Sequence, residues 1–109
     1  MVLRFYLFSV ILVGLVSCSN QQPQTDVLPP ETPEEKGASL FIMHCASCHG
    51  ENGKLGASGA KDLTISKLSD QEIEKIIVNG KNAMPPMSVL LENKENLNLV
   101  IKHVKSLRK

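Results

Sequence analysis

The chain has 109 residues, with 12 basic and 11 acidic side chains and a formal net charge of +1. A chain of this length forms one domain, which excludes a multidomain enzyme or an α/β barrel, and its balanced charge argues against a nucleic-acid-binding protein. Aromatic residues make up 4% of the chain, and only Phe41 lies beyond the first eight residues, while 3 cysteines are too few for a disulfide scaffold. A small domain with so few large apolar side chains needs another source of stability.

Residues 1–17 are predicted to be a signal peptide. Arg4 carries the positive charge of such a segment, and a nearly unbroken apolar run of about 12 residues extends from Phe5 to Val16. This run is short for a membrane span, which needs roughly 20 residues, and it matches the apolar region of a signal peptide. An uncleaved N-terminal anchor helix is the alternative interpretation.

The apolar run ends in L-V-S-C at residues 15–18, which resembles the lipobox of bacterial lipoproteins. The resemblance implies cleavage before Cys18 and acylation of its sulfur and its new amino group, so that the mature chain comprises residues 18–109. Ser19 follows the cysteine instead of Asp, so the resemblance also implies that a signal for retention in the inner membrane is missing. The expected location is the cell envelope, with a lipid anchor in a membrane that faces the periplasm or in the outer face of the cytoplasmic membrane.

Residues 18–33 are predicted to be a flexible linker behind this lipid anchor. Four prolines lie between residues 19 and 33, and the only aliphatic side chains there are Val27 and Leu28. Such a segment buries too little apolar surface to offset the entropy lost on ordering. At full stretch it reaches about 50 Å, which would let an anchored domain swing between partners.

Three main helices are predicted from residue 32 onward. The first begins at a capping box formed by Thr32 and Glu35, with Pro33 at the first helical position. Its predicted buried face has the i, i+3, i+4, i+7 spacing of a helix and comprises Ala38, Phe41, Ile42 and Cys45.

The second helix begins at another capping box, Ser69 with Glu72, and ends at Gly80, and a third begins near Asn93. Their apolar stripes comprise Ile73, Ile76 and Ile77 in the second helix, and Leu97, Val100, Ile101, Val104 and Leu107 in the third. No segment shows the sustained alternation of a strand, so the predicted fold is all-α. The connections 50–68 and 80–92 are predicted to lack regular structure, and loops of this length in a small domain usually wrap around something.

The chemistry is expected at residues 45–49, which read C-A-S-C-H and match the attachment motif for a c-type haem, C-x-x-C-H. Two thiols three residues apart can add to the two vinyl groups of one porphyrin. The imidazole of His49, directly after the second cysteine, would then lie under the iron.

Three other interpretations of this motif are open. A thioredoxin-like C-x-x-C requires a βαβ context, which the predicted helices do not provide. A zinc site would need four ligands and would have to add His44 or His103 to the residues of the motif. A chance match is the third.

Residues 36–109 resemble a small monohaem cytochrome c of class I. The resemblance rests on a glycine and a phenylalanine of the first helix, the haem motif, the G-K-N-A-M-P segment and the end of the last helix: Gly37, Phe41, residues 45–50, residues 80–85 and residues 104–107. It implies an all-α cytochrome c-like domain at 34–109, with three main helices and long loops wrapped around one haem. That haem would be covalently attached through Cys45 and Cys48, with His49 and Met84 as the axial ligands of its iron.

Met87 and His103 are the alternatives to Met84 as the second axial ligand. Met84 is favoured because Pro85 restricts the backbone before it and because the family's axial Met stands in a similar Ala-Met-Pro context. Met87 falls where the family commonly has a bulky apolar residue, so its thioether is expected to fill a gap beside the haem. His44 is expected at the surface, turned away from the haem.

Two positions depart from the family pattern. His103 stands where the family usually has Tyr or Trp, against the face formed by Gly37 and Phe41, so the crossing of the first and last helices should be either weaker there or hydrogen-bonded. Lys61 stands where members often have a Pro whose carbonyl orients the haem-ligating His. A backbone carbonyl is still available at Lys61 to do the same.

The resemblance implies a one-electron carrier without enzymatic activity, since two protein ligands leave no iron position for a substrate. It would act as a monomer that shuttles electrons between redox proteins of a respiratory chain. The alternative is a haem-bearing subunit of a larger oxidase or reductase complex. A surplus of basic residues near the C-terminus is either a solvated helix end or a docking rim for an acidic partner, and it comprises Lys102, Lys105, Arg108 and Lys109.

Overall fold

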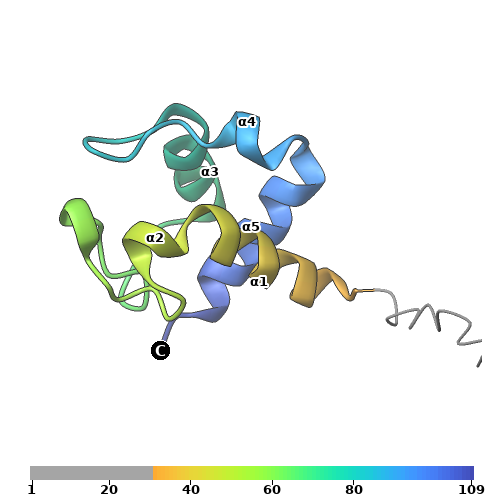
Figure 1. The fold of residues 1–109 in the computed structure, drawn as a ribbon, viewed down its shortest axis with the longest axis horizontal. Helices are drawn as coiled ribbons and strands as arrows, with labels where there is room; N and C mark the ends of the chain where they lie inside the picture. The colour runs from red at the N-terminus through yellow and green to blue at the C-terminus, as the bar shows by residue number, and fades with distance from the viewer. Residues whose placement is uncertain (1–30) are drawn as a thin grey trace, which may run out of the picture.

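A computed structural model describes residues 31–109 of the chain (Figure 1). The predicted signal peptide, Cys18 and most of the predicted linker lie outside the described residues. The fold is all-α: among residues 31–109 the only β-type pairing is an isolated bridge between Lys81 and Met84. The elements are α1 (Pro33–His44), α2 (Ala46–His49), the 3-10 helix η1 (Ala57–Gly59), α3 (Asp70–Asn79), α4 (Ser88–Leu91) and α5 (Lys94–Ser106).

The three predicted main helices are confirmed as α1, α3 and α5, and they begin where the local sequence signals place them. Both predicted capping boxes form, with the side chain of Thr32 capping α1 and that of Ser69 capping α3. At α5 the side chain of Asn93 accepts a hydrogen bond from the backbone N–H of Asn96. None of the helices in the described part of the chain has the length and the apolar character that a membrane span requires.

The prediction that the two long connections lack regular structure is wrong in part. The first contains η1, and the second contains the single turn of α4, in which Leu91 is buried. The hydrophobic pattern of so short a helix cannot be distinguished from that of an irregular loop. Leu91 packs into the core with residues of α3 and α5, so tertiary contacts stabilise this turn.

The predicted buried face of α1 also needs correction. Only Gly37 and Phe41 are buried, Ile42 is 51% exposed, and Cys45 lies beyond the end of the helix. The reason is a narrow crossing with α5: a Cβ atom at Gly37 would lie 2.7 Å from the backbone oxygen of Leu99. The close approach of α5 at Gly37 places Gly37 and Phe41 in the contact between the two helices, whereas Ile42 lies outside it and is exposed.

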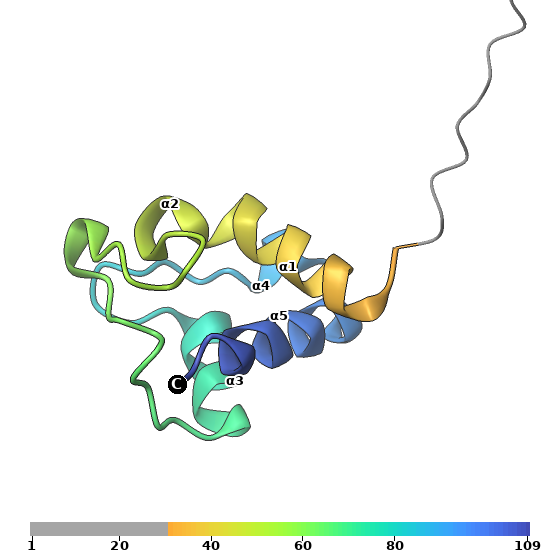
Figure 2. The ribbon, with the colours of Figure 1, turned by 90° about the horizontal axis from the view of Figure 1, so that it is seen from below.

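The crossing of α1 and α5 is the largest contact between elements of the domain, and Figure 2 shows the two helices one above the other. At its centre Phe41 is fully buried, and its ring centroid lies 4.9 Å from that of His103. An ion pair between Glu34 and Lys102 joins the same two helices at the surface. The predicted position of His103 against the face of Gly37 and Phe41 is confirmed.

The imidazole of His103 is poorly accommodated at this crossing. Its Nε2 is buried and has no hydrogen-bond partner among the described residues. Desolvation on burial lowers the pKa of His103 below its ordinary value of 6.5. The folded chain therefore binds a proton there less readily than the unfolded chain does, so stability is greatest above the unfolded pKa and falls as pH drops through it.

We expect His103→Phe to raise the stability of the folded protein by about 1 kcal/mol, because it removes a buried polar atom without a partner. It should also reduce the loss of stability between about pH 7 and about pH 5, where the unfolded chain takes up the proton of His103. Urea unfolding of the two proteins across this pH range measures both effects. An equal pH dependence in the two proteins would contradict the assignment to His103.

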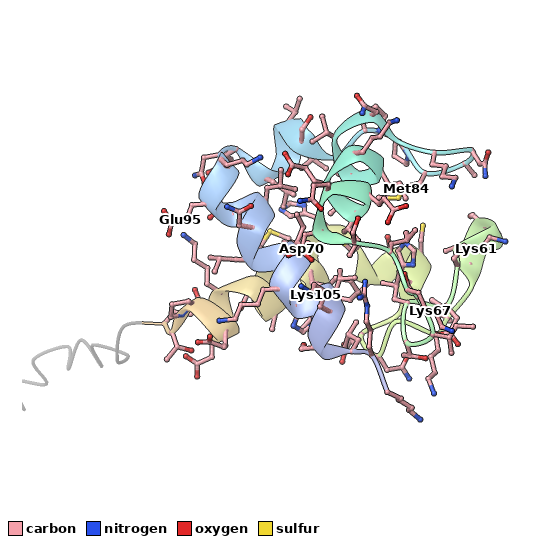
Figure 3. The ribbon with its side chains drawn as sticks, turned by 180° about the vertical axis from the view of Figure 1, so that it is seen from behind. Lys61, Lys67, Asp70, Met84, Glu95 and Lys105 are labelled. Atoms are coloured by element: carbon pink, nitrogen blue, oxygen red, sulfur yellow. The ribbon has the colours of Figure 1, made fainter. Side chains whose placement is uncertain are left out.

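The C-terminal basic residues form contacts within the chain. Lys102 pairs with Glu34. Lys105 lies 2.6 Å from Asp70 of α3, and Figure 3 shows the labels of these two residues close together. The Nη2 atom of Arg108 donates a hydrogen bond to the carbonyl of Leu68, 2.7 Å away. These contacts attach α5 to α1, to α3 and to the first long connection, while the side chains of Lys102 and Lys105 stay exposed at the surface.

Candidate haem-binding site

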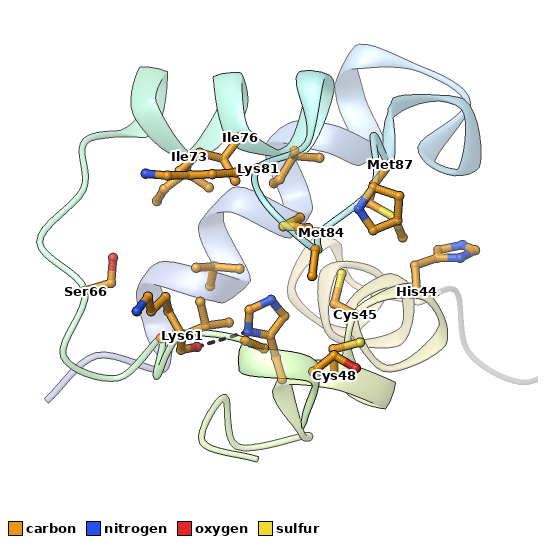
Figure 4. Close-up of a pocket in the computed structure, with 18 of the residues that line it drawn as sticks. His44, Cys45, Cys48, Lys61, Ser66, Ile73, Ile76, Lys81, Met84 and Met87 are labelled. Atoms are coloured by element: carbon orange, nitrogen blue, oxygen red, sulfur yellow. Dashed lines mark hydrogen bonds between the residues drawn. The ribbon is translucent and has the colours of Figure 1, made fainter. Parts of the chain in front are cut away.

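A cavity of about 530 Å³ lies between α1 and α2 on one side and α3 with the following connection on the other (Figure 4). Its walls are mostly apolar. Five of the eight buried side chains of the hydrophobic core line it, namely Phe41, Ile73, Ile77, Val100 and Val104. The core of this domain is therefore built around the cavity, so a large apolar group bound there would complete it.

The two cysteines of the motif enter this cavity from the junction of α1 and α2. Cys45 lies between the two helices, and Cys48 lies within the single turn of α2. Both are free thiols. Burial, with a smaller contribution from the neighbouring Cys48, raises the pKa of Cys45 to about 11. Redox-active C-x-x-C pairs instead have a lowered pKa, so this environment disfavours the thioredoxin-like interpretation.

His49 is the last residue of α2, and its imidazole is oriented by the first long connection. Its Nδ1 lies 3.1 Å from the backbone carbonyl of Lys61. Because a carbonyl can only accept, Nδ1 carries the proton, and Nε2 keeps the free lone pair that a metal ligand needs. Such a hydrogen bond fixes both the tautomer and the orientation of a metal-binding imidazole. The expectation for the Lys61 carbonyl is confirmed.

Backbone hydrogen bonds hold this connection against α2. The N–H of Leu55 donates to the carbonyl of His49 over 2.8 Å, and the N–H of Leu63 donates to the carbonyl of Gly53 over 2.9 Å. Gly53 has a φ of 77°, and a Cβ atom there would lie 3.1 Å from side-chain atoms of Leu107 and Leu63. The loop is thereby folded back so that the Lys61 carbonyl reaches the imidazole.

Met84 enters the cavity from the connection between α3 and α4, above Cys45 and Cys48 in the view of Figure 4. Met87 also lines the cavity, and both methionines pack against the hydrophobic core. The two differ in their backbone contacts. Met84 exchanges two hydrogen bonds with Lys81, whereas Met87 donates one to the carbonyl of Ile77 in α3 over 2.8 Å. The choice between them as an iron ligand stays a prediction.

The other two histidines occupy different places. His44, expected at the surface, is half-buried and lines the cavity, and its ring points away from Met84 and Cys45 in Figure 4. His103 is absent from the cavity wall, since it packs on Phe41 at the helix crossing. Within residues 31–109, no three His, Cys, Asp or Glu side chains come together as a metal site, so this part of the chain offers no support for the zinc interpretation.

The sequence did not single out several residues that complete the cavity. From the first long connection they are Ala57, Ala60, Leu63, Ser66 and Leu68. Isolated leucines in a connection without periodicity carry no signal of burial. Asn82 and Ala83 line the opposite side. In the sequence, only their place in the G-K-N-A-M-P segment indicates that they lie near the haem.

Comparison with known proteins agrees with this geometry. The sequence profile of the family described as cytochrome c oxidase, cbb3-type, subunit III matches residues 32–103. The chain belongs to this family. Cytochrome c-551 of Bacillus subtilis is 30% identical to it over 82 residues, which cover 73% of this chain and 72% of that protein. The predicted class, a small class I cytochrome c, is confirmed.

Other relatives are larger proteins. The cbb3-type cytochrome c oxidase subunit FixP of Azorhizobium caulinodans is 37% identical over 68 residues, which are 53% of this chain and 22% of that protein. The cytochrome bc1 complex cytochrome c subunit of Corynebacterium diphtheriae is 32% identical over 73 residues, or 65% of this chain and 26% of that one. This chain therefore spans about a quarter or less of the length of these two relatives.

Membership in the family establishes the cofactor as a covalently bound c-type haem and the chain as an electron-transfer protein. The residues of the cavity fit this group. The thiols of Cys45 and Cys48 and the imidazole of His49, protonated on Nδ1, lie on one side of the cavity. The thioether of Met84 lies on the other side, and the walls between them are mostly apolar.

Proposed function

We propose that this cytochrome c is a one-electron carrier whose haem iron is bound by His49 and Met84. Its electrons would pass between redox proteins of a respiratory chain at the cell envelope. The observation that carries the proposal is the hydrogen bond from His49 Nδ1 to the Lys61 carbonyl. It supports iron binding through Nε2, on the side of the cavity that carries both cysteines.

The residues of the chain have distinct roles in this proposal. The haem, when bound, supplies a reversible one-electron couple between Fe(III) and Fe(II). Cys45 and Cys48 attach it covalently, and His49 holds a proton on Nδ1 so that its other nitrogen is available to the iron. The thioether of Met84 favours the reduced form and raises the potential. The apolar walls exclude water and lower the local dielectric, which also tunes the potential.

This arrangement favours electron transfer without bond chemistry. If His49 and Met84 both bind the iron, neither axial position remains open to oxygen or to another substrate. We therefore propose a carrier and not a haem peroxidase or a ligand sensor, both of which need an open position.

The test is expression of the chain with a cytochrome c maturation system. The protein should keep its haem through a denaturing gel, which a haem stain detects. Its optical spectrum should be that of a six-coordinate c-type cytochrome that is reduced and reoxidised without binding carbon monoxide. Rapid carbon monoxide binding to the reduced protein would show an open iron position and would contradict the carrier assignment.

A subunit of a larger complex is the second candidate, because two relatives are named as subunits of a cbb3-type oxidase and of a bc1 complex. The two candidates differ in what the protein binds in the membrane. Haem-stained protein that copurifies in fixed proportion with an oxidase or reductase after mild solubilisation would indicate a subunit. A monomer that separates from every such complex would indicate a free shuttle.

We also propose that Cys18 carries a lipid anchor. In that case the exported protein should partition into the detergent phase of a Triton X-114 extraction, and its mature N-terminus should be an acylated Cys18. Cys18→Ala should be neither acylated nor cleaved at this site, while its haem spectrum should stay unchanged. A wild-type N-terminus at another residue, without acyl mass in mass spectrometry, would refute the anchor.

A further inference from the structure

The four residues from Lys81 to Met84 form a tight turn that carries Met84. The N–H of Lys81 donates to the carbonyl of Met84 over 2.9 Å, and the N–H of Met84 donates to the carbonyl of Lys81 over 3.0 Å. Only Asn82 and Ala83 lie between these two residues. Asn82 has a φ of 54°, which makes it one of three non-glycine residues with positive φ in the described part of the chain.

The turn is attached to the end of α3 on both sides. Before it, Gly80 passes so close that a Cβ atom there would lie 2.6 Å from the backbone oxygen of Met84 and 2.9 Å from the nitrogen of Pro86. After it, the N–H of Met87 donates to the carbonyl of Ile77. With both ends held against α3, the direction in which Met84 leaves the backbone depends on the conformation of the turn.

We propose that Asn82 is a positioning residue for the axial methionine: its left-handed backbone holds the turn that directs Met84 toward the haem iron. The inference rests on the proposed function, in which Met84 is the second axial ligand. Positive φ at a central position is typical of two-residue hairpin turns. Asparagine tolerates this region better than other residues with a side chain, and β-branched residues tolerate it worst.

The contribution of Asn82 is expected to come from its backbone. Asn82 lines the cavity, but its side chain is exposed, and the glycine variant, which loses the side chain and tolerates the conformation, separates a cavity contact from the backbone effect. A residue that resists positive φ should instead weaken the turn and let Met84 leave the iron more often. The cost of the left-handed conformation for such a residue corresponds to about a tenfold change in an equilibrium or a rate.

The experiment compares Asn82→Gly, Asn82→Ala and Asn82→Val as haem-containing proteins. Two readouts report on Met84: the weak long-wavelength absorption band that marks an iron–methionine bond in oxidised cytochromes c, and the rate at which imidazole replaces the methionine. The imidazole rate should stay near wild type for glycine, rise for alanine and rise about tenfold for valine. The band should weaken from the glycine to the alanine to the valine variant. If the valine variant does not acquire haem, the difference between the alanine and glycine variants still tests the inference.

Glu92→Val is the matched control. Glu92 also has positive φ, at 66°, and it is exposed and outside the cavity wall. This variant should lower the stability of the fold without changing the band or the imidazole rate. An equal rise in the imidazole rate for Glu92→Val would mean that any loss of fold stability releases the methionine, and it would overturn the inference.

Two further outcomes distinguish this inference from the proposal on which it rests. A wild-type protein with the band, whose Asn82→Val variant keeps both the band and the wild-type imidazole rate, would overturn the role of Asn82 alone. A wild-type protein without the band would overturn the assignment of Met84 and, with it, the role of Asn82.

Discussion

Met84→Ala should abolish the long-wavelength absorption band of the oxidised protein and lower its reduction potential. The thioether stabilises Fe(II), and without it water or a stronger donor takes its place on the iron. Different axial ligands spread haem potentials over about 0.8 V, so loss of the thioether should give a fall that a redox titration readily resolves. Optical spectroscopy of the oxidised protein and a redox titration measure the two effects.

Met87→Ala is the matched control, because it removes a second thioether from the same connection and the same cavity wall. It should keep the band and lower the stability by about 2–3 kcal/mol or less, as expected for a partly buried side chain. If the band survives in Met84→Ala and is lost in Met87→Ala, Met87 is the ligand. A wild-type protein without the band would point to a nitrogen ligand, although His103 lies outside the cavity wall.

A protein made without haem, with Cys45→Ala and Cys48→Ala, should show no cooperative thermal unfolding. Phe41 is the only aromatic residue of residues 31–109, and five of the eight core side chains face the cavity. Without the haem these side chains border a cavity of about 530 Å³ and lose the packing contacts that the haem would make with them. A small domain has a total stability of only about 5–15 kcal/mol, so such a loss should be enough to abolish a cooperative fold.

Calorimetry and circular dichroism on heating show whether the haem-free double variant unfolds cooperatively. Ser47→Ala changes an exposed residue between the two cysteines at the cavity wall and keeps both thiols, so this variant should retain haem and unfold cooperatively. A sharp transition in the haem-free double variant would show that the polypeptide alone supplies a sufficient core.

The starts of the main helices could be predicted because capping is a local interaction. Thr32 with Glu35 and Ser69 with Glu72 satisfy backbone groups within one turn of chain, so these signals do not depend on the rest of the fold. The motif at residues 45–49 is equally local, because the spacing of its thiols and the imidazole follows from covalent geometry. The sequence also predicted the class of the protein, which the comparisons confirm, whereas haem attachment through Cys45 and Cys48 stays a prediction.

Other features depended on segments that meet only in the folded chain. The buried side of α1 is set by the close approach of α5 at Gly37, which leaves Ile42 exposed. The turn of α4 forms where Leu91 finds a place in the core.

The same division holds within the site. His49 was evident from its place in the motif, but its protonated nitrogen is decided by the Lys61 carbonyl, 12 residues along the chain. The sequence pointed to Met84 through its neighbours, whereas its direction depends on a turn held against α3 by Gly80 and Met87. Local hydrogen bonds and covalent spacing act within a few residues and can be recognised in a sequence. Orientation inside the cavity arises from contacts between distant segments, so only the tertiary structure decides it.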